Sequence, residues 1–245
     1  MRSAWGMHFN DHEKEVLANL YTKYSDRTVD LLAEANIDWV WITWSVGFSE
    51  ADEAEQREQC QRLTAKLHAR GIKVAAYMCA VSMFWESMFR DHPRSVRWIL
   101  FDPKGDPHRY SGGRDPLRFI GDVGNPEWLD YQKRRVGSIV DAGLDAIFFD
   151  NTASPGWNES EKLAGFFAAI RRYIHEEKKS NIVLFTNYGL NPQGVTLNRD
   201  MEFVFNEGWK EPGVWDGEWM AANIRRMKYV RGVVGEWKPM TSEYS

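Results

Sequence analysis

The chain has 245 residues, of which 43% are hydrophobic and 27% are charged, and its formal net charge is -4. This balance is typical of a folded globular domain and excludes a disordered, fibrous or collagen-like chain. The chain has no excess of basic residues with which to neutralise phosphates, so we do not expect it to bind nucleic acid.

The sequence also bears on membranes and on cysteine chemistry. Residues 1–8 contain no apolar core of a signal peptide, and no apolar run approaches the roughly 18 residues that a membrane-spanning helix needs. The two cysteines, Cys60 and Cys79, do not make a disulfide framework and have no metal-ligand spacing, so we expect two buried thiols. These features predict a cytoplasmic protein with no membrane partner, provided that no leader has been removed.

Strand-like and helix-like patterns alternate along the chain. Runs rich in aromatic and β-branched residues predict strands, whereas the N-cap residues Ser25 and Asn125 and the terminal glycines Gly71 and Gly143 mark helix ends. In chain order we expect a first strand over 4–10, a helix over 26–35, a strand over 37–44, a helix that starts at 49 and stops at 71, a strand over 72–78, an irregular segment over 81–124, a helix over 125–142, a strand over 144–150, a helix over 158–178, strands over 181–187 and 201–207, a helix over 217–230 and a candidate seventh strand over 237–241.

The irregular segment over 81–124 is rich in Pro, Gly and Asp and has no clean period. Turns are expected at 102–105 and 111–113. A loop of this length inside a compact domain is usually a lid or a binding loop.

The repeated alternation of strand and helix predicts a parallel sheet covered by helices. A (β/α)8 barrel and an open doubly wound sheet both fit this pattern. No G-x-G-x-x-G follows the first strand and no G-x-x-x-x-G-K-[ST] is present, so the open nucleotide-binding sheet lacks its usual chemistry. We therefore favour the barrel, as a single domain over residues 1–245. Six strands and a candidate seventh leave no sequence for an eighth, so we expect a barrel that is truncated at its C-terminus, belongs to a longer enzyme or is closed in an unusual way.

Polar residues gather at the carboxyl ends of the predicted strands, which form one rim in a barrel and hold its active site. Asp150 ends the fourth strand and Glu207 ends the sixth. Because side chains of one layer come from alternate strands, these two carboxylates can lie on the order of 5–6 Å apart, the separation found in retaining glycosidases. In that chemistry one carboxylate attacks the anomeric carbon, and the other carboxyl group gives its proton to the leaving oxygen.

Other residues of the predicted rim are candidates for contacts with a sugar. The chain has 12 Trp, and five lie at or just beyond strand ends: Trp44, Trp85, Trp157, Trp209 and Trp237. Indole faces stack on sugar rings, although a single Trp is more often a packing residue. The candidate substrate-binding residues are His8, Asn10, Trp44, Tyr77, Asn151, Asn187, Tyr188, Asn206 and Trp209.

The helix start Asn-Pro-Glu-Trp at 125–128 precedes the strand Gly-Leu-Asp-Ala-Ile-Phe-Phe-Asp at 143–150. This arrangement resembles the glycoside hydrolases of the α-galactosidase-like clan and the related "hypothetical glycosyl hydrolase" families, and the resemblance covers the chain from the first strand to the sixth. It implies a barrel glycosidase with Asp150 as the nucleophile and an acid/base on the sixth strand, which strand count assigns to Glu207. That clan typically has Asp as the acid/base, so Glu207 departs from its pattern.

Two other functions and another acid/base assignment stay open. A non-catalytic carbohydrate-binding barrel related to glycosidases would show the same aromatic rim without a pair of carboxylates that shares a proton. A metal-dependent hydrolase is less favoured, because the chain has six His but no H-x-H pair. A strand count that is off by one would move the acid/base to Glu236 or Glu243. We expect a carbohydrate substrate, no cofactor and no metal; the sugar, its linkage, the anomeric outcome and the oligomeric state stay open.

Overall fold

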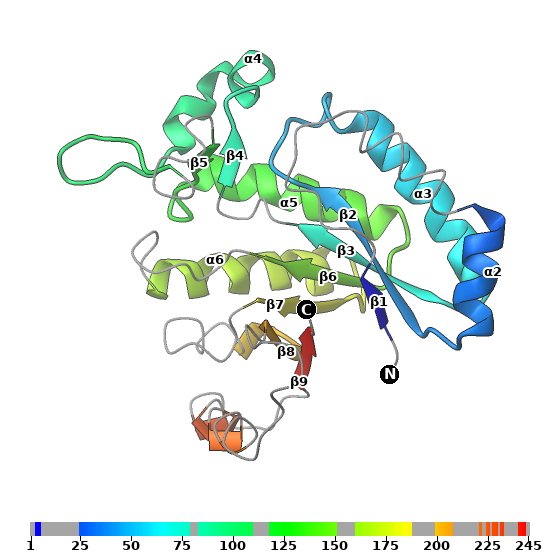
Figure 1. The fold of residues 1–245 in the computed structure, drawn as a ribbon. Coiled ribbons are helices and arrows are strands. Elements are labelled where there is room, and N and C mark those ends of the chain that lie inside the picture. Colours follow the sequence, from blue (N-terminus) through cyan, green and yellow to red (C-terminus); the bar gives the residue numbers. More distant parts are fainter. Residues whose placement is uncertain are drawn as a thin grey trace.

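The computed structural model describes residues 3–5, 25–78, 83–109, 118–150, 160–187, 199–207 and 240–243, with parts of 221–232. Its main feature is a parallel sheet of seven strands in the order β1-β2-β3-β6-β7-β8-β9 (Figure 1). These strands are β1 (Ser3–Trp5), β2 (Trp39–Ser45), β3 (Lys73–Met78), β6 (Ala146–Phe149), β7 (Val183–Thr186), β8 (Phe203–Glu207) and β9 (Met240–Glu243).

Helices connect the strands and pack against one face of the sheet (Figure 1). They are α2 (Asp26–Glu34), α3 (Ala54–His68), α5 (Pro126–Asp141) and α6 (Ser160–Arg172), which continues as a π-helix over Tyr173–Glu177. A sheet whose strands keep their chain order has the barrel arrangement, whereas a doubly wound sheet reverses its order. The predicted (β/α)8-type fold is therefore confirmed, although β1 and β9 remain unpaired with each other in the described part of the chain.

Most of the predicted elements are present. The five strands predicted from 37–44 to 201–207 agree with the structure to within two residues at each end, and the candidate seventh strand is β9. The helix predicted from residue 49 begins later, at Ala54, because the Ser49 hydroxyl accepts from the Asp52 N–H at 3.2 Å in a turn that precedes the helix. Of the first predicted strand, only Ser3–Trp5 is described as a strand. The helix predicted over 217–230 corresponds to helical residues between 221 and 232.

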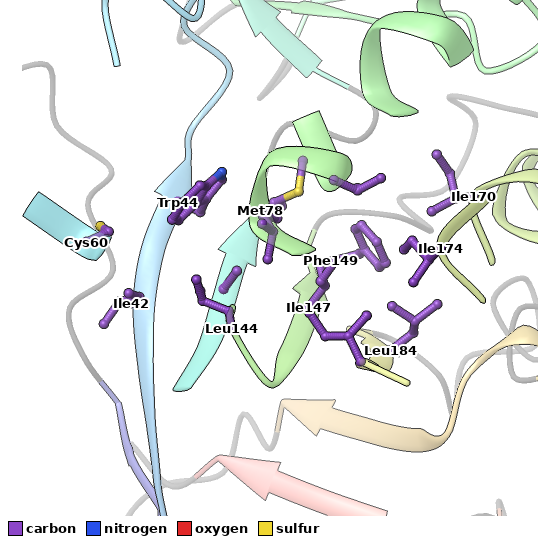
Figure 2. Packing of buried hydrophobic residues seen from close by; sticks show 14 of the residues in the cluster. Ile42, Trp44, Cys60, Met78, Leu144, Ile147, Phe149, Ile170, Ile174 and Leu184 are labelled. Carbon is purple, nitrogen blue, oxygen red and sulfur yellow. The ribbon is translucent and has the colours of Figure 1, made fainter. Parts of the chain in front are cut away.

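Side chains of the sheet alternate between two layers. The outer layer lies between the sheet and the helices and includes Ile42 and Trp44 of β2 together with Cys60 of α3 (Figure 2). The inner layer lies on the opposite face and consists of Trp41, Ala75, Tyr77, Ile120, Ala146, Phe148 and Phe185. Because both faces of the strands are buried, the strands appear in the sequence as near-continuous apolar runs.

One extra residue interrupts the alternation near the end of β2. Thr43 pairs with Tyr77, whereas Ser45, two residues further on, pairs with Met78, only one residue further on. The Thr43 carbonyl accepts hydrogen bonds from α3, from the Gln56 side-chain amide at 2.7 Å and from the Cys60 thiol at 3.2 Å.

The thiol of Cys60 is buried, as predicted. Burial raises its pKa to about 12, so the thiol keeps its proton at neutral pH and acts as a donor. Cys79 lies outside the described residues.

Residues 83–109 and 118–121 form a small additional unit between β3 and α5, here called the β4–β5 unit (Figure 1). It contains β4 (Met83–Trp85), α4 (Met88–Asp91), a 3-10 helix (Pro93–Trp98) and β5 (Arg118–Ile120), and β4 and β5 pair antiparallel. The prediction of a wholly irregular segment is therefore corrected, since strands of three residues are too short to show a period. The predicted turn at 102–105 is confirmed by a hydrogen bond from the Gly105 N–H to the Asp102 carbonyl at 3.0 Å. The turn predicted at 111–113 lies outside the described residues.

Asn125 joins the β4–β5 unit to α5 and confirms the predicted cap. Its side-chain oxygen accepts from the N–H groups of Glu127 at 2.9 Å and Trp128 at 3.3 Å. Its side-chain nitrogen donates to the Arg97 carbonyl at 2.7 Å. One side chain therefore satisfies the start of the helix and ties the preceding unit to it.

Replacement of Asn125 with Ala removes both sets of bonds and should lower the free energy of unfolding by about 1–2 kcal/mol. Asn125→Asp keeps an acceptor for the helix but cannot donate to Arg97, so it should recover most of this loss. Urea denaturation at pH 7 measures both effects, with the exposed Asp130→Ala on α5 as the control. Equal stability of Asn125→Ala and the control would contradict the prediction.

Candidate active site

Asp150 lies directly after β6, at the carboxyl end of that strand. Its backbone N–H donates to the Met78 carbonyl at 2.9 Å, so the pairing of β3 with β6 continues past the last strand residue. Ala146 and Phe148 precede Asp150 at intervals of two residues and belong to the inner layer, so the strand period directs the Asp150 side chain to the same face. Only 5% of the residue is exposed. A buried carboxylate in this place has the position of an active-site residue in a barrel.

Two donors hold the Asp150 carboxylate. The Tyr77 hydroxyl donates to Oδ2 at 2.6 Å, and the Asn187 side-chain amide donates to Oδ1 at 2.7 Å. Tyr77 pairs with Phe148 in the sheet, and Phe148 pairs with Phe185. Asp150 lies two residues after Phe148, and Asn187 lies two residues after Phe185. Both side chains therefore lie within reach of the Tyr77 phenol. Hydrogen bonds to a carboxylate favour its ionised form and fix its orientation.

An aromatic layer lies on the amino-terminal side of this carboxylate. The ring of Phe148 lies 4.8 Å from Trp41, 5.0 Å from Phe185 and 5.7 Å from Tyr77, measured between centroids. Ile120 of the β4–β5 unit packs into the same layer. The carboxylate therefore borders apolar surface, where the local dielectric is low and its hydrogen bonds are stronger than in water.

Residues 45–52, here called the rim segment, begin with the last residue of β2 and lie against the β4–β5 unit. The backbone N–H of Trp85 donates to the Gly47 carbonyl at 3.0 Å, and its indole N–H donates to the Val46 carbonyl at 3.0 Å. The Phe48 ring stacks on Trp85 with centroids 5.2 Å apart. Val46 also packs against the inner layer, so the rim segment borders the layer that carries Tyr77.

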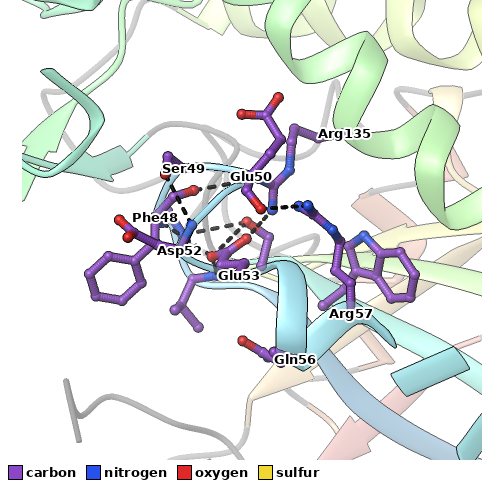
Figure 3. Close-up of polar contacts among 12 residues, drawn as sticks. Phe48, Ser49, Glu50, Asp52, Glu53, Gln56, Arg57 and Arg135 are labelled. Carbon is purple, nitrogen blue, oxygen red and sulfur yellow. Dashed lines mark hydrogen bonds and ion pairs between the residues drawn. The ribbon is translucent and has the colours of Figure 1, made fainter. Parts of the chain in front are cut away.

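A buried ion pair contacts the rim segment and joins the start of α3 to α5. Glu53, the residue before α3, pairs with Arg135 of α5, and each side chain is only 2% exposed (Figure 3). Burial lowers the pKa of the Arg135 guanidinium, but the Glu53 carboxylate outweighs burial and leaves the pKa above its ordinary value. The Arg135 guanidinium therefore stays charged at neutral pH.

This pair could not be predicted from the sequence, because 82 residues separate its members. One signal was available: Arg135 lies four residues after Tyr131 and four before Ile139, on the buried face of α5. A charged residue in such a stripe usually has a buried partner, but the sequence does not name it.

Three of the predicted site residues meet in the structure. They are Asp150, Tyr77 and Asn187, which lie on the inner face at the ends of β6, β3 and β7. Tyr77 and Asn187 both donate to the carboxylate, and their expected contact with a sugar stays a prediction.

Trp44 and Trp85, which were expected on an exposed aromatic rim, are packing residues. Trp44 is fully buried in the outer layer, where its indole N–H donates to Ser138 Oγ of α5 at 3.2 Å. Its place follows from the strand period, because Ile42 two residues earlier also faces the helices. Trp85 is 5% exposed and lies between Phe48 and the Arg118 guanidinium, which is 4.6 Å from the ring centroid. Neither indole offers a free face to a sugar, so both expectations are corrected.

The remaining predicted positions are not described in side-chain detail. Asn206 and Glu207 lie in β8, and Glu207 pairs with Glu243 of β9, but only the backbone of these residues is described. The predicted positions outside the described residues are His8, Asn10, Asn151, Trp157, Tyr188, Trp209, Glu236 and Trp237.

Two of the described histidines each bond a carboxylate. His68 bonds Asp145 at 2.8 Å, and His92 bonds Glu50 at 2.9 Å. Among the described residues, no group of three or more His, Cys, Asp or Glu side chains could hold a metal ion. None of the described helices combines the length and the apolar character that crossing a bilayer requires.

No protein-family model and no curated protein matches the chain. Solved structures do match. The α-galactosidase TtGalA from Thermus thermophilus, in complex with p-nitrophenyl α-D-galactopyranoside, has a TM-score of 0.65 at 16% identity over 100% of this chain and 51% of its own. Eubacterium rectale Amy13B has a TM-score of 0.67 at 11% identity over 98% of this chain and 56% of its own.

A third similar structure is the glycoside hydrolase domain of PelA from Pseudomonas aeruginosa, with a TM-score of 0.56 at 16% identity over 98% of this chain and 82% of its own. The chain spans about half the length of the α-galactosidase that it matches. At these identities the likeness establishes the barrel fold.

The bond between Tyr77 and Asp150 predicts a measurable energetic coupling. Tyr77→Phe leaves the buried carboxylate with one donor fewer and should lower the free energy of unfolding by about 1.5–3 kcal/mol. In an Asp150→Asn background the same change should cost less, so the double-mutant cycle should give a coupling of about 1 kcal/mol or more. Urea denaturation of the four proteins measures it, with the exposed Tyr229→Phe as the control. Additive effects of the two substitutions would contradict a direct bond.

Glu50 gives the rim segment a dependence on pH. Burial raises the pKa of its carboxyl, but hydrogen bonds from His92 and from its own backbone, with the Arg135 charge, outweigh burial and hold the pKa below its ordinary value of 4.5. A carboxyl with a lower pKa in the folded than in the unfolded state stabilises the fold above its unfolded pKa, and this contribution is lost as the pH falls.

Glu50→Gln should therefore lose less unfolding free energy than wild type between about pH 5 and pH 3. Urea denaturation at stepped pH compares the two proteins, and the exposed Glu55→Gln serves as the control. Identical pH profiles for wild type and Glu50→Gln would show that the ion pair with His92 does not contribute.

Proposed function

We propose that the protein is a glycoside hydrolase that acts by a two-carboxylate, retaining mechanism, with Asp150 as the nucleophile and Glu207 as the acid/base. The observation that carries the proposal is the buried Asp150 carboxylate, held by Tyr77 and Asn187 at the carboxyl end of β6. The similar solved structures, which include an α-galactosidase and the glycoside hydrolase domain of PelA, support the same class of chemistry.

A nucleophilic carboxylate must be ionised and correctly oriented. The donors from Tyr77 and Asn187 favour the ionised form, and each occupies one carboxylate oxygen. The same donors restrict rotation of the carboxylate, which favours attack from one direction.

Glu207 is proposed as the acid/base from its place in β8. Phe203 at the start of this strand packs on the inner layer, and the two-residue period predicts the same face for residue 207. In a retaining enzyme the two carboxyl groups lie about 5–5.5 Å apart. The acid/base first gives its proton to the leaving oxygen and then deprotonates the water that releases the sugar.

We propose that the substrate is a carbohydrate. The candidates for contacts with it are His8, Asn10, Tyr77, Asn151, Asn187, Tyr188, Asn206 and Trp209. Two of the similar structures are complexes of the Thermus thermophilus α-galactosidase, with p-nitrophenyl α-D-galactopyranoside and with stachyose, and a third is a complex of Aspergillus fumigatus Ega3 with galactosamine. α-Galactosides and galactosamine-containing oligosaccharides are therefore the first substrates to test.

The test begins with turnover of nitrophenyl glycosides and oligosaccharides by the wild-type protein. Asp150→Asn should lower kcat by about three orders of magnitude or more, because the nucleophile is lost. Glu207→Gln should lower kcat by about 10²–10⁴-fold on oligosaccharides, and by less on nitrophenyl glycosides, whose leaving group needs little protonation. The exposed Asp130→Asn on α5 is the control.

A 2-deoxy-2-fluoro glycoside of the cleaved sugar should label the nucleophile, with the added mass on the peptide that contains Asp150. NMR of the first-formed product should show the anomeric configuration of the substrate. Full turnover by both carboxylate variants would sink the assignment. Sugar binding without turnover by the wild-type protein would instead favour a non-catalytic carbohydrate-binding barrel.

A further inference from the structure

Glu53 uses its two carboxylate oxygens for different contacts. One oxygen pairs with the Arg135 guanidinium. The other accepts three hydrogen bonds from the rim segment: from the Val46 N–H at 3.0 Å, from the Phe48 N–H at 3.2 Å and from the Ser45 hydroxyl at 3.3 Å. Arg135 therefore holds the carboxylate, and the carboxylate gathers the donors of the rim segment around one atom (Figure 3).

The rim segment is bonded in turn to the β4–β5 unit. Both backbone and indole N–H groups of Trp85 donate to carbonyls of the segment, and three side-chain pairs connect it to the end of α4 and the residue after it. These pairs are Arg90–Asp52 at 2.7 Å, His92–Glu50 at 2.9 Å and Ser49–Asp91. The segment and the unit therefore form one connected body.

This body reaches the candidate site through the inner layer. Ile120, the last residue of β5, is fully buried and packs in the inner layer with Tyr77. Val46 of the rim segment packs against the same layer. A shift of the rim segment would therefore change the packing that directs the Tyr77 phenol toward Asp150.

We propose that Glu53 is a positioning residue for the reaction. It fixes the rim segment and, through Trp85, the β4–β5 unit, and these parts hold the inner layer in the arrangement that aims Tyr77 at the Asp150 carboxylate. The kinetic part of this inference rests on the proposed glycosidase function, whereas the link from Glu53 to Trp85 does not.

Two double variants separate the contacts of the rim segment from the buried charge. Glu53→Gln/Arg135→Met and Glu53→Met/Arg135→Met both remove the ion pair, so neither leaves one buried charge without its partner. Gln keeps a side-chain oxygen that accepts from Val46 and Phe48, whereas Met has no such acceptor. The two proteins therefore differ in the side-chain acceptor at position 53, which is the feature that the proposal requires. Glu55→Gln, on the exposed face of α3, is the control.

Steady-state kinetics use a glycoside that the wild-type protein cleaves. The Met/Met variant should lower kcat at least about tenfold with KM within about twofold, because a small displacement of a catalytic group costs rate rather than ground-state binding. The Gln/Met variant should recover most of this loss. Melting temperatures of both variants are measured, so that the comparison is made between folded proteins. Equal kcat values for the two double variants would overturn the proposal.

A second measurement does not depend on any substrate. The NMR signal of the Trp85 indole N–H reports its bond to the Val46 carbonyl, and it should shift and exchange faster with solvent in the Met/Met variant than in the Gln/Met variant. If the wild-type protein cleaves no glycoside but this change is seen, the proposed function fails and the link from Glu53 to Trp85 stands. An unchanged signal overturns the inference, whatever the catalytic result.

If neither double variant folds, Trp85→Phe takes their place. It keeps an aromatic ring against Phe48, and it removes the indole N–H that bonds Val46 together with part of the ring system. We expect a loss in kcat of about threefold or more with KM unchanged. An unchanged kcat would overturn the proposal.

Discussion

The carboxyl end of the barrel depends on the ion pair between Glu53 and Arg135. Removal of two charges from water costs several kcal/mol for each ion, and further hydrogen bonds to the two groups offset part of that cost. Here Glu53 accepts from the segment after β2, and Arg135 also donates to the Tyr131 hydroxyl at 3.3 Å. The pair thereby connects the end of β2, helices α3 and α5 and, through the rim segment, the β4–β5 unit. These parts are far apart in the sequence.

The inner layer changes character along the strands, and this change creates the candidate site. It is aromatic at the level of Phe148 and Phe185 and becomes polar two residues later, at Asp150 and Asn187. The carboxylate consequently has apolar rings on one side and polar donors beside it. The two donors give the buried carboxylate a defined orientation, which an enzyme that forms a covalent bond through a carboxylate needs.

The sequence predicted the strands because strands buried on both faces are continuous apolar runs, and it predicted Asp150 because a carboxylate ends such a run. It identified Tyr77 and Asn187 as site residues but did not predict their bonds to Asp150, because those bonds depend on the register of three strands. Trp44 was assigned to the rim because the prediction counted its distance from the strand end and not its face. The β4–β5 unit and the partner of Arg135 could not be predicted, because they depend on very short strands and on a contact across 82 residues.

The extra residue in β2 has a consequence for the comparison of related chains. Before it, Trp39 and Trp41 face the inner layer; after it, Val46 does, so inward positions change from odd to even numbers. A related chain that lacks this residue would keep the same inner layer only under one condition. Its pattern of apolar and polar residues would have to be shifted by one position between this point and the next helix. An alignment without a gap there would match inward residues with outward ones. Two barrels could thus share their architecture while the residue types at their aligned positions differ. A one-residue gap in the alignment would then mark the shift.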